Sequence, residues 1–182
     1  MEDWLIQWGF PFFVAFLGAL VHGVLGFGSG LVCMALLPLL WDISYTVGVL
    51  SPLASVLSIL LTFKLKEHIR LDEARPLLLA TPFGVITGLW MLQSWPDSLM
   101  KALLGALLLF FVGNSLLQSS THRTVHPSFG AIAGFLGGAT GAAFGVSGPP
   151  VLIYATAAGW ERDRFRANLQ IFFSLTCILA FF

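Results

Sequence analysis

Two glycine-rich stretches interrupt the long apolar runs of this sequence, and each carries a serine among its glycines. The first is Gly26-Phe27-Gly28-Ser29-Gly30 and the second is Gly145-Val146-Ser147-Gly148-Pro149-Pro150. Glycine allows a sharp backbone turn and the close approach of a ligand. Where a helix restarts after such a break, its free N–H groups and positive dipole end attract an anion, and a serine hydroxyl adds a donor. These stretches therefore favour the binding of a small anion.

The candidate substrate-binding residues follow from this pattern. His22 lies one or two turns before the first stretch and could sense protons, although a histidine bonded to a neighbouring carbonyl fits equally well. Asn168 and Gln170 open the last apolar segment, where they are expected either to face the second stretch or to cap a helix. The full predicted set is Gly28, Ser29, Gly30, Val146, Ser147, Gly148, His22 and Asn168.

Other polar residues and glycines have a more ordinary interpretation. Ser51, Ser55 and Ser58 share one helix face and could line a pathway, but hydrogen bonding between helices is the preferred explanation. Arg166 could guide an anion, but a role in setting the topology is preferred. Many of the remaining glycines recur four residues apart, which is the close-packing spacing of membrane helices.

The amino-acid composition indicates that these residues belong to a membrane protein. Of 182 residues, 57% are hydrophobic and 10% charged, whereas about a quarter of a soluble domain is charged. The net charge of zero offers no basic face to nucleic acid. Cys33 and Cys177 lie in apolar runs and suggest neither disulfides nor a metal cluster, and no cofactor is expected. The acidic start, Met1-Glu2-Asp3-Trp4, is unlike a signal peptide, so the first apolar segment is expected to remain in the protein.

The apolar segments predict an all-helical protein that crosses the membrane several times. The alternating pattern of a membrane β-barrel is missing from the sequence. The expected segments cover residues 10–40, 46–63, 76–92, 99–117 and 129–158, with a last one from about 167 onward. The first and the fifth contain the two glycine-rich stretches and are each expected to be broken or re-entrant.

The two interrupted segments resemble each other, which predicts an internal duplication. A shift of 118 residues superimposes three pairs: Gly23 on Gly141, Ser29 on Ser147 and Gly30 on Gly148. We therefore expect a single membrane domain over residues 1–182, made of one repeat at 1–117 and the start of a second at 127–182. The second repeat is expected to be incomplete, as in a truncated chain.

The basic residues discriminate between two topologies. If each interrupted segment crosses once, five basic residues fall on one side and four on the other, which is a poor positive-inside signal. If each segment returns as a re-entrant hairpin, only Lys101 lies outside, and eight residues are cytoplasmic: Lys64, Lys66, Arg70, Arg75, Arg123, Arg162, Arg164 and Arg166. The hairpin topology is preferred, and it makes the second repeat inverted, as in many secondary transporters. A full helix followed by a half-helix stays open.

The sequence resembles the sulfite exporter TauE/SafE family in three places. The stretch from His22 to Leu31, followed by Pro38, looks like the family's first-repeat signature, and the stretch from Gly141 to Pro150 looks like its second-repeat counterpart. Phe165-Arg166-Ala167-Asn168-Leu169 resembles the start of the family's next helix. The resemblance implies a permease of the bacterial inner membrane that moves sulfite, organosulfonates or related small anions.

The predicted function is secondary transport of a small sulfur-containing anion, with the lipid bilayer as the other partner and no enzymatic activity. The oligomeric state is left open, a homo-oligomer being one alternative. Gly145-Val146-Ser147-Gly148 also matches the Gly-x-Ser-Gly pattern of rhomboid-type intramembrane serine proteases. Such a nucleophile needs a histidine base, however, and no histidine follows Ser147. A non-transporting membrane subunit is the third alternative.

Overall fold

The computed structural model describes residues 9–117 and 126–181, and every regular element in those two ranges is helical. In chain order the elements are α2 (Phe10–Leu25), α3 (Ser29–Leu36), the 3-10 helix η2 (Leu37–Leu39), α4 (Ile43–Leu65), the 3-10 helix η3 (Lys66–His68), α5 (Leu71–Ser94), α6 (Asp97–Leu117), α7 (Pro127–Phe144), α8 (Gly148–Ala157) and α9 (Arg162–Phe181). The helices α4, α5 and α6 are long and apolar enough to cross a membrane. The prediction of an all-helical multi-pass membrane protein is confirmed.

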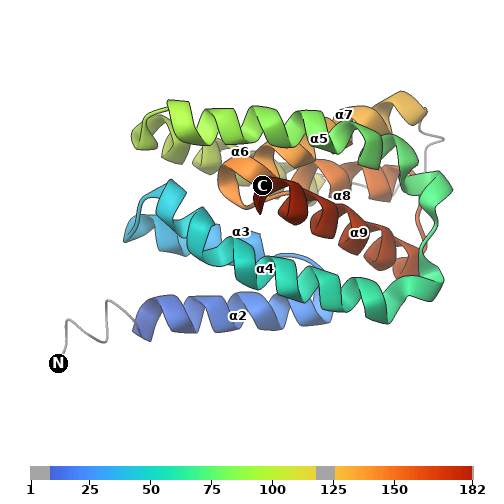
Figure 1. Cartoon of the computed structure of the whole chain (residues 1–182), viewed down its shortest axis with the longest axis horizontal. Helices are drawn as coiled ribbons and strands as arrows, with labels where there is room; N and C mark the ends of the chain where they lie inside the picture. Colours follow the sequence, from blue (N-terminus) through green and yellow to red (C-terminus); the bar gives the residue numbers. More distant parts are fainter. Residues whose placement is uncertain (1–8, 118–125, 182) are drawn as a thin grey trace.

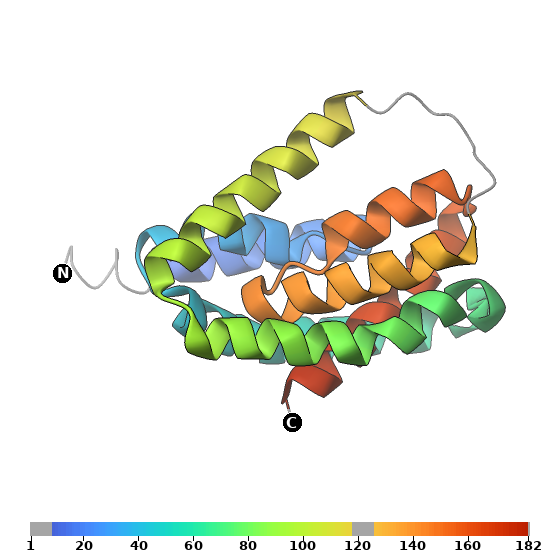
Figure 2. The same ribbon diagram turned by 90° about the horizontal axis from the view of Figure 1, so that it is seen from above.

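The long helices lie along one axis of the bundle. The three candidate spans α4, α5 and α6 run from one end of the bundle to the other, and α6 diverges from α7 and α8 toward its own C-terminal end (Figures 1 and 2). The predicted segments at 46–63, 76–92 and 99–117 fall within these three helices. The last helix, α9, begins at Arg162 rather than near residue 167, because its first turn is built from charged residues that the apolar pattern omits.

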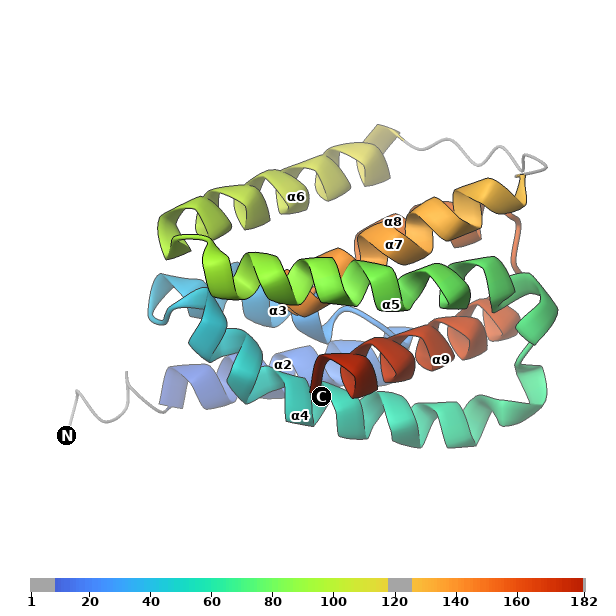
Figure 3. The ribbon, with the colours of Figure 1, turned by 45° about the horizontal axis from the view of Figure 1, so that its top comes forward.

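The first interrupted segment is a helical hairpin. The helix α2 has 16 residues and α3 has eight, both shorter than the roughly 20 residues that cross a bilayer. They run antiparallel, because the thiol of Cys33 lies 3.8 Å from the carbonyl oxygen of Val14, and Gly18 packs against both Cys33 and Ser29. The chain therefore returns to the end of the bundle from which α2 started (Figure 3).

The second interrupted segment is also a hairpin, and it starts from the opposite end. The helix α7 has 18 residues and α8 has ten. Gly137 packs against Val151 of the returning helix, and Gly130 packs against the ring of Tyr154. The helix α7 begins at the end of the bundle where α5 begins and α4 finishes, whereas α2 begins at the other end (Figure 1). The two hairpins thus enter the bundle from opposite ends.

The described basic residues are divided between these two ends as the hairpin topology requires. At one end, Arg164 lies 3.7 Å from Glu73 and the backbone N–H of Arg70 is bonded to α9. The described basic residues at this end are Lys64, Lys66, Arg70, Arg75, Arg162, Arg164 and Arg166. At the other end, Lys101 pairs with Asp97 at 2.8 Å, and Asp97 accepts from the N–H of Ile43. Arg123 lies outside the described residues.

Among the described helices, α5 and α7 pack against each other most extensively, along a seam of glycines. Gly84 of α5 lies against the carbonyl oxygen of Phe135, and Gly134 of α7 lies against that of Leu77. A Cβ atom at either position would overlap the opposing backbone, so only glycine permits this separation. Gly84 and Gly134 are each followed by a second glycine four residues later, Gly88 and Gly138, and this spacing predicted such packing.

Gly84→Ala is expected to destabilise the protein by about 1–3 kcal/mol, because the new methyl group forces α5 away from α7. The effect is measured as a lower midpoint of thermal unfolding in detergent. Gly105→Ala in α6 is the matched control, since a Cβ at Gly105 meets no atom within 4 Å. Equal unfolding midpoints for the two variants would contradict the packing described for this seam.

Candidate functional site

Each hairpin turns at a glycine in the left-handed conformation. Gly26 has φ 83° and donates its N–H to the carbonyl of His22, and Gly28, with φ 103°, precedes the first residue of α3. Gly145 has φ 64° and donates to the carbonyl of Gly141 in the same way. A side chain at any of these positions would be strained, which explains why the sequence breaks its helices with glycine.

The two breaks are offset by 119 residues, from Gly26 to Gly145, and not by the 118 that superimposes the serines. Ser29 is the first residue of α3, whereas Ser147 stands before the first residue of α8. The two serines therefore occupy different positions at the start of the helix that follows: Ser29 is the first helical residue of α3, and Ser147 is the N-cap residue of α8. The expected duplication remains a prediction.

The tips of the two hairpins meet in the middle of the bundle. Gly30 of α3 packs directly on the carbonyl oxygen of Gly145, and a Cβ built on it would also lie 3.6 Å from the Cα atom of Val146. Any larger residue at position 30 would overlap that carbonyl group. Gly30 is therefore the residue that lets two segments, entering from opposite ends, come into backbone contact.

Two adjoining pockets of about 60 and 50 Å³ lie at this junction, and we call them together the tip cavity. They share six lining residues: Ser29, Gly30, Ala54, Gly145, Ser147 and Cys177. Seven of the eight residues predicted for the site line the second pocket: His22, Gly28, Ser29, Gly30, Val146, Ser147 and Gly148. The volume suits an ion of a few heavy atoms, because a water-sized particle needs at least roughly 10–15 Å³ of such space.

The donors at the tip cavity come unequally from the two helices. The N–H groups in the first turn of a helix have no partner within it, so Ser29, Gly30 and Leu31 of α3 can offer theirs to a ligand. In α8, Pro149 and Pro150 occupy the first turn and carry no N–H. The helix α8 thus contributes the N–H of Gly148, together with the hydroxyl of Ser147. The positive dipole ends of both helices favour a negative charge between them.

A buried side-chain network leads from α9 to the cavity. Nδ1 of His22 lies 2.8 Å from Oγ of Ser29, and Nε2 of the same ring lies 3.5 Å from Nε2 of Gln170. The amide nitrogen of Gln170 also donates to the carbonyl oxygen of Gly26. Gln170 was not among the eight predicted site residues, although its amide in an apolar segment indicated that it could face the second hairpin. The structure places it against Gly26 of the first hairpin instead.

Asn168 lies apart from this network. Its amide oxygen accepts from the backbone N–H of Arg70 at 3.0 Å, just before α5, and Asn168 does not line either pocket. Asn168 therefore bonds at a helix terminus, as one of its two predicted roles requires. The helix is α5, which is distant in the chain from Asn168. Arg166 lies over the first hairpin turn instead, with a guanidinium nitrogen 3.5 Å from the carbonyl oxygen of Gly23.

Two serines of α4 donate to carbonyls of their own helix, and Ser55 also contacts the thiol of Cys177 on α9. The hydroxyl of Ser51 donates to the carbonyl of Val47 at 2.6 Å, and that of Ser55 donates to the carbonyl of Ser51 at 2.7 Å. A serine bonded to the carbonyl four residues earlier satisfies its polar atom inside its own helix. Ser51 and Ser58 line the tip cavity at the same time.

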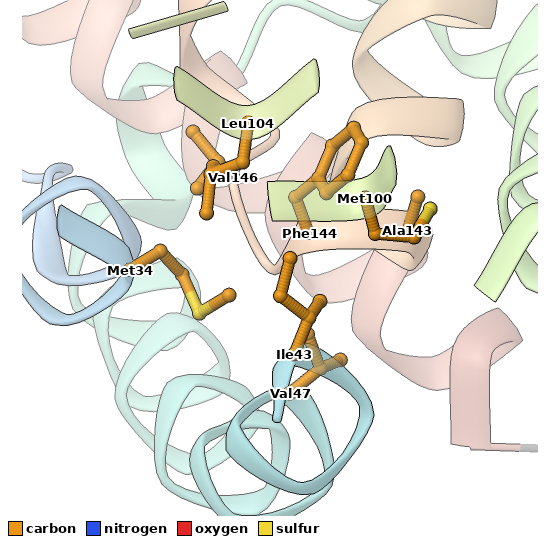
Figure 4. Packing of buried hydrophobic residues seen from close by; sticks show 8 residues of the cluster. All are labelled: Met34, Ile43, Val47, Met100, Leu104, Ala143, Phe144 and Val146. Atoms are coloured by element: carbon orange, nitrogen blue, oxygen red, sulfur yellow. The ribbon is translucent and has the colours of Figure 1, made fainter. Parts of the chain in front are cut away.

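An apolar cluster of buried side chains packs around the second tip beside this polar site. Figure 4 shows side chains of α3, α4, α6 and α7 converging around Val146, which is only 2% exposed. The cluster comprises Met34, Ile43, Val47, Met100, Leu104, Ala143, Phe144 and Val146. Close-packed interiors of this kind resist displacement, so the cluster holds the α7–α8 turn against the first hairpin.

Comparison with known proteins identifies a family. A family model described as "Sulfite exporter TauE/SafE" matches residues 11–182, nearly the whole chain. No curated protein and no solved structure gives a significant match.

Proposed function

The chain belongs to the sulfite exporter TauE/SafE family, and from that premise we propose that it exports a small sulfur-containing oxyanion, such as sulfite or an organosulfonate, across the bacterial inner membrane. The observation that carries the proposal is the tip cavity. The N-termini of α3 and α8 lie at the tips of two hairpins that enter from opposite ends of the bundle. Together with the hydroxyls of Ser29 and Ser147, they border the tip cavity. Such a set of uncharged donors suits a small anion that must be released again.

The proposed mechanism is alternating access around a fixed site. Because one hairpin starts from each end of the bundle, a small shift of one hairpin against the other would open the cavity to one side while the other stays closed. No phosphate-binding loop of an ATPase occurs in the sequence. The energy is therefore proposed to come from the gradient of the substrate or of a coupled ion.

The membrane orientation proposed here places the arginine-rich end, with η3 and the start of α9, in the cytoplasm. Single-cysteine variants in a background lacking Cys33 and Cys177 test it with a membrane-impermeant maleimide. A cysteine replacing Glu67 is expected to be labelled only after the cells are permeabilised, whereas one replacing Ser98 is labelled in intact cells. The reverse pattern would overturn the orientation and leave the bundle unchanged.

Transport is tested in proteoliposomes that contain the purified chain and labelled sulfite. The proposal predicts efflux of labelled sulfite that unlabelled sulfite and short sulfonates lower when they are enclosed with it, and that enclosed chloride does not affect. Liposomes without protein provide the background rate. Flux indistinguishable from that background, or equal competition by chloride, would overturn the proposed substrate class.

A further inference from the structure

Three polar side chains, two buried and one half-buried, form a chain that ends at the tip cavity: Gln170 on α9, His22 on α2 and the half-buried Ser29 on α3. His22 is 3% exposed and Gln170 is fully buried. The mechanism above uses the hydroxyl of Ser29 as a donor to the anion. A hydroxyl can also accept, so something must determine which of the two it does toward the cavity.

The orientation of the Gln170 amide is set by the backbone. Its Nε2 atom contacts the carbonyl oxygen of Gly26, and a carbonyl oxygen can only accept. The opposite orientation would bring the amide oxygen against that carbonyl oxygen, with two acceptors in contact. The amide nitrogen is therefore the atom that faces both Gly26 and His22, and the amide oxygen is left without a hydrogen-bond partner among the described residues.

The same nitrogen determines where the proton lies on the ring of His22. Nε2 of His22 faces an N–H group of Gln170 at 3.5 Å, so the favourable arrangement has Nε2 unprotonated and accepting. A neutral ring then carries its proton on Nδ1. Nδ1 lies 2.8 Å from Oγ of Ser29 and donates to it.

Once Oγ of Ser29 accepts from His22, the hydroxyl proton is free to point elsewhere. Ser29 lines both pockets of the tip cavity. We propose that Gln170 is a positioning residue, which through His22 fixes the Ser29 hydroxyl as a hydrogen-bond donor into the cavity and so selects an anion that accepts there. This proposal rests on the proposed transport function and adds to it the residue that sets the polarity of the site.

The proton position is measured directly by nitrogen NMR on ¹⁵N-labelled protein in lipid, with the His22 signals assigned by their loss in His22→Gln. The wild-type ring is expected to be protonated at Nδ1 and unprotonated at Nε2. In Gln170→Glu the carboxylate cannot donate and instead accepts from the ring, so Nε2 is expected to become protonated. A residue with only a packing role would not move the proton in this way.

A double-mutant cycle tests whether Gln170 acts through Ser29. Gln170→Met keeps the length of the side chain and removes its donors, and it is expected to weaken sulfite affinity roughly tenfold, the scale of one hydrogen bond to a charged group. In a Ser29→Ala background the same change should have no further effect on affinity. Ser174→Ala is the control on the same helix, because it removes a buried interhelical bond to Thr62 away from the cavity.

The outcomes separate this inference from the proposed function. A wild-type His22 protonated at Nε2 overturns the inference whether or not sulfite is transported, because the proton is located in the wild-type protein. Additive losses in the double variant overturn it as well. Absence of sulfite flux in the wild type, together with an Nδ1-protonated ring, would overturn the transport function while the proton arrangement stands.

Discussion

Gly30→Ala is expected to abolish sulfite transport while the protein still inserts and folds. The added methyl group would overlap the carbonyl oxygen of Gly145, so the tips of the two hairpins cannot meet. Both the N–H groups of α3 and the hydroxyl of Ser147 would then lie at the wrong separation for one small anion. The measurement is labelled-sulfite flux in proteoliposomes, alongside the elution profile in detergent.

Gly48→Ala is the matched control, because a Cβ on that residue of α4 meets no atom within 4 Å. The control should transport at the wild-type rate, since alanine at an open helical position costs nothing in packing and favours the helix. Wild-type flux in Gly30→Ala would show that contact between the tips is not needed for transport.

The double variant Ser29→Ala, Ser147→Ala is expected to lower sulfite affinity by at least about a hundredfold. Each hydroxyl bond to a charged ligand is worth about 1.5–3 kcal/mol, and two are removed. Each single variant is expected to lose less than the double. Affinity is read from the concentration dependence of flux, and the unfolding midpoint verifies that the fold is retained.

The same double variant separates transport from a purely structural role in the membrane. Ser174→Ala is its control, since it makes the same substitution at a buried hydroxyl that bonds to Thr62 at 3.0 Å. If the double variant keeps its cellular role and its sulfite affinity, the two serines do not hold the anion. A non-transporting membrane subunit would then become the better account.

Local sequence patterns were sufficient for the helices and for the breaks between them. Apolar length predicted α4, α5 and α6, and glycine marked both turns, because only glycine adopts the left-handed conformation found at Gly26 and Gly145. The one-sided distribution of basic residues predicted the hairpins, since a re-entrant path is the one that collects them at one end. These features depend on short-range conformation or on overall charge placement.

Contacts between distant segments could not be predicted in this way. Gln170 is bonded to Gly26, 144 residues away, and Asn168 to Arg70, 98 residues away. The sequence contained both amides on one helix, but it carried no signal for which one faces the cavity, because a helix turns by about 100° per residue. The difference between the 119-residue offset of the two breaks and the 118-residue offset of the serines was not predicted either, because backbone angles determine where each helix restarts.

Binding of a small oxyanion between the two hairpin tips can be observed with selenite. Selenite has the charge and pyramidal shape of sulfite, and its selenium gives an anomalous X-ray signal in crystals of the protein grown without selenomethionine. We expect one anomalous peak in the tip cavity, within hydrogen-bond distance of the Ser29 hydroxyl. A peak found only among the arginines at the start of α9, or no ordered peak at saturating selenite, would contradict it.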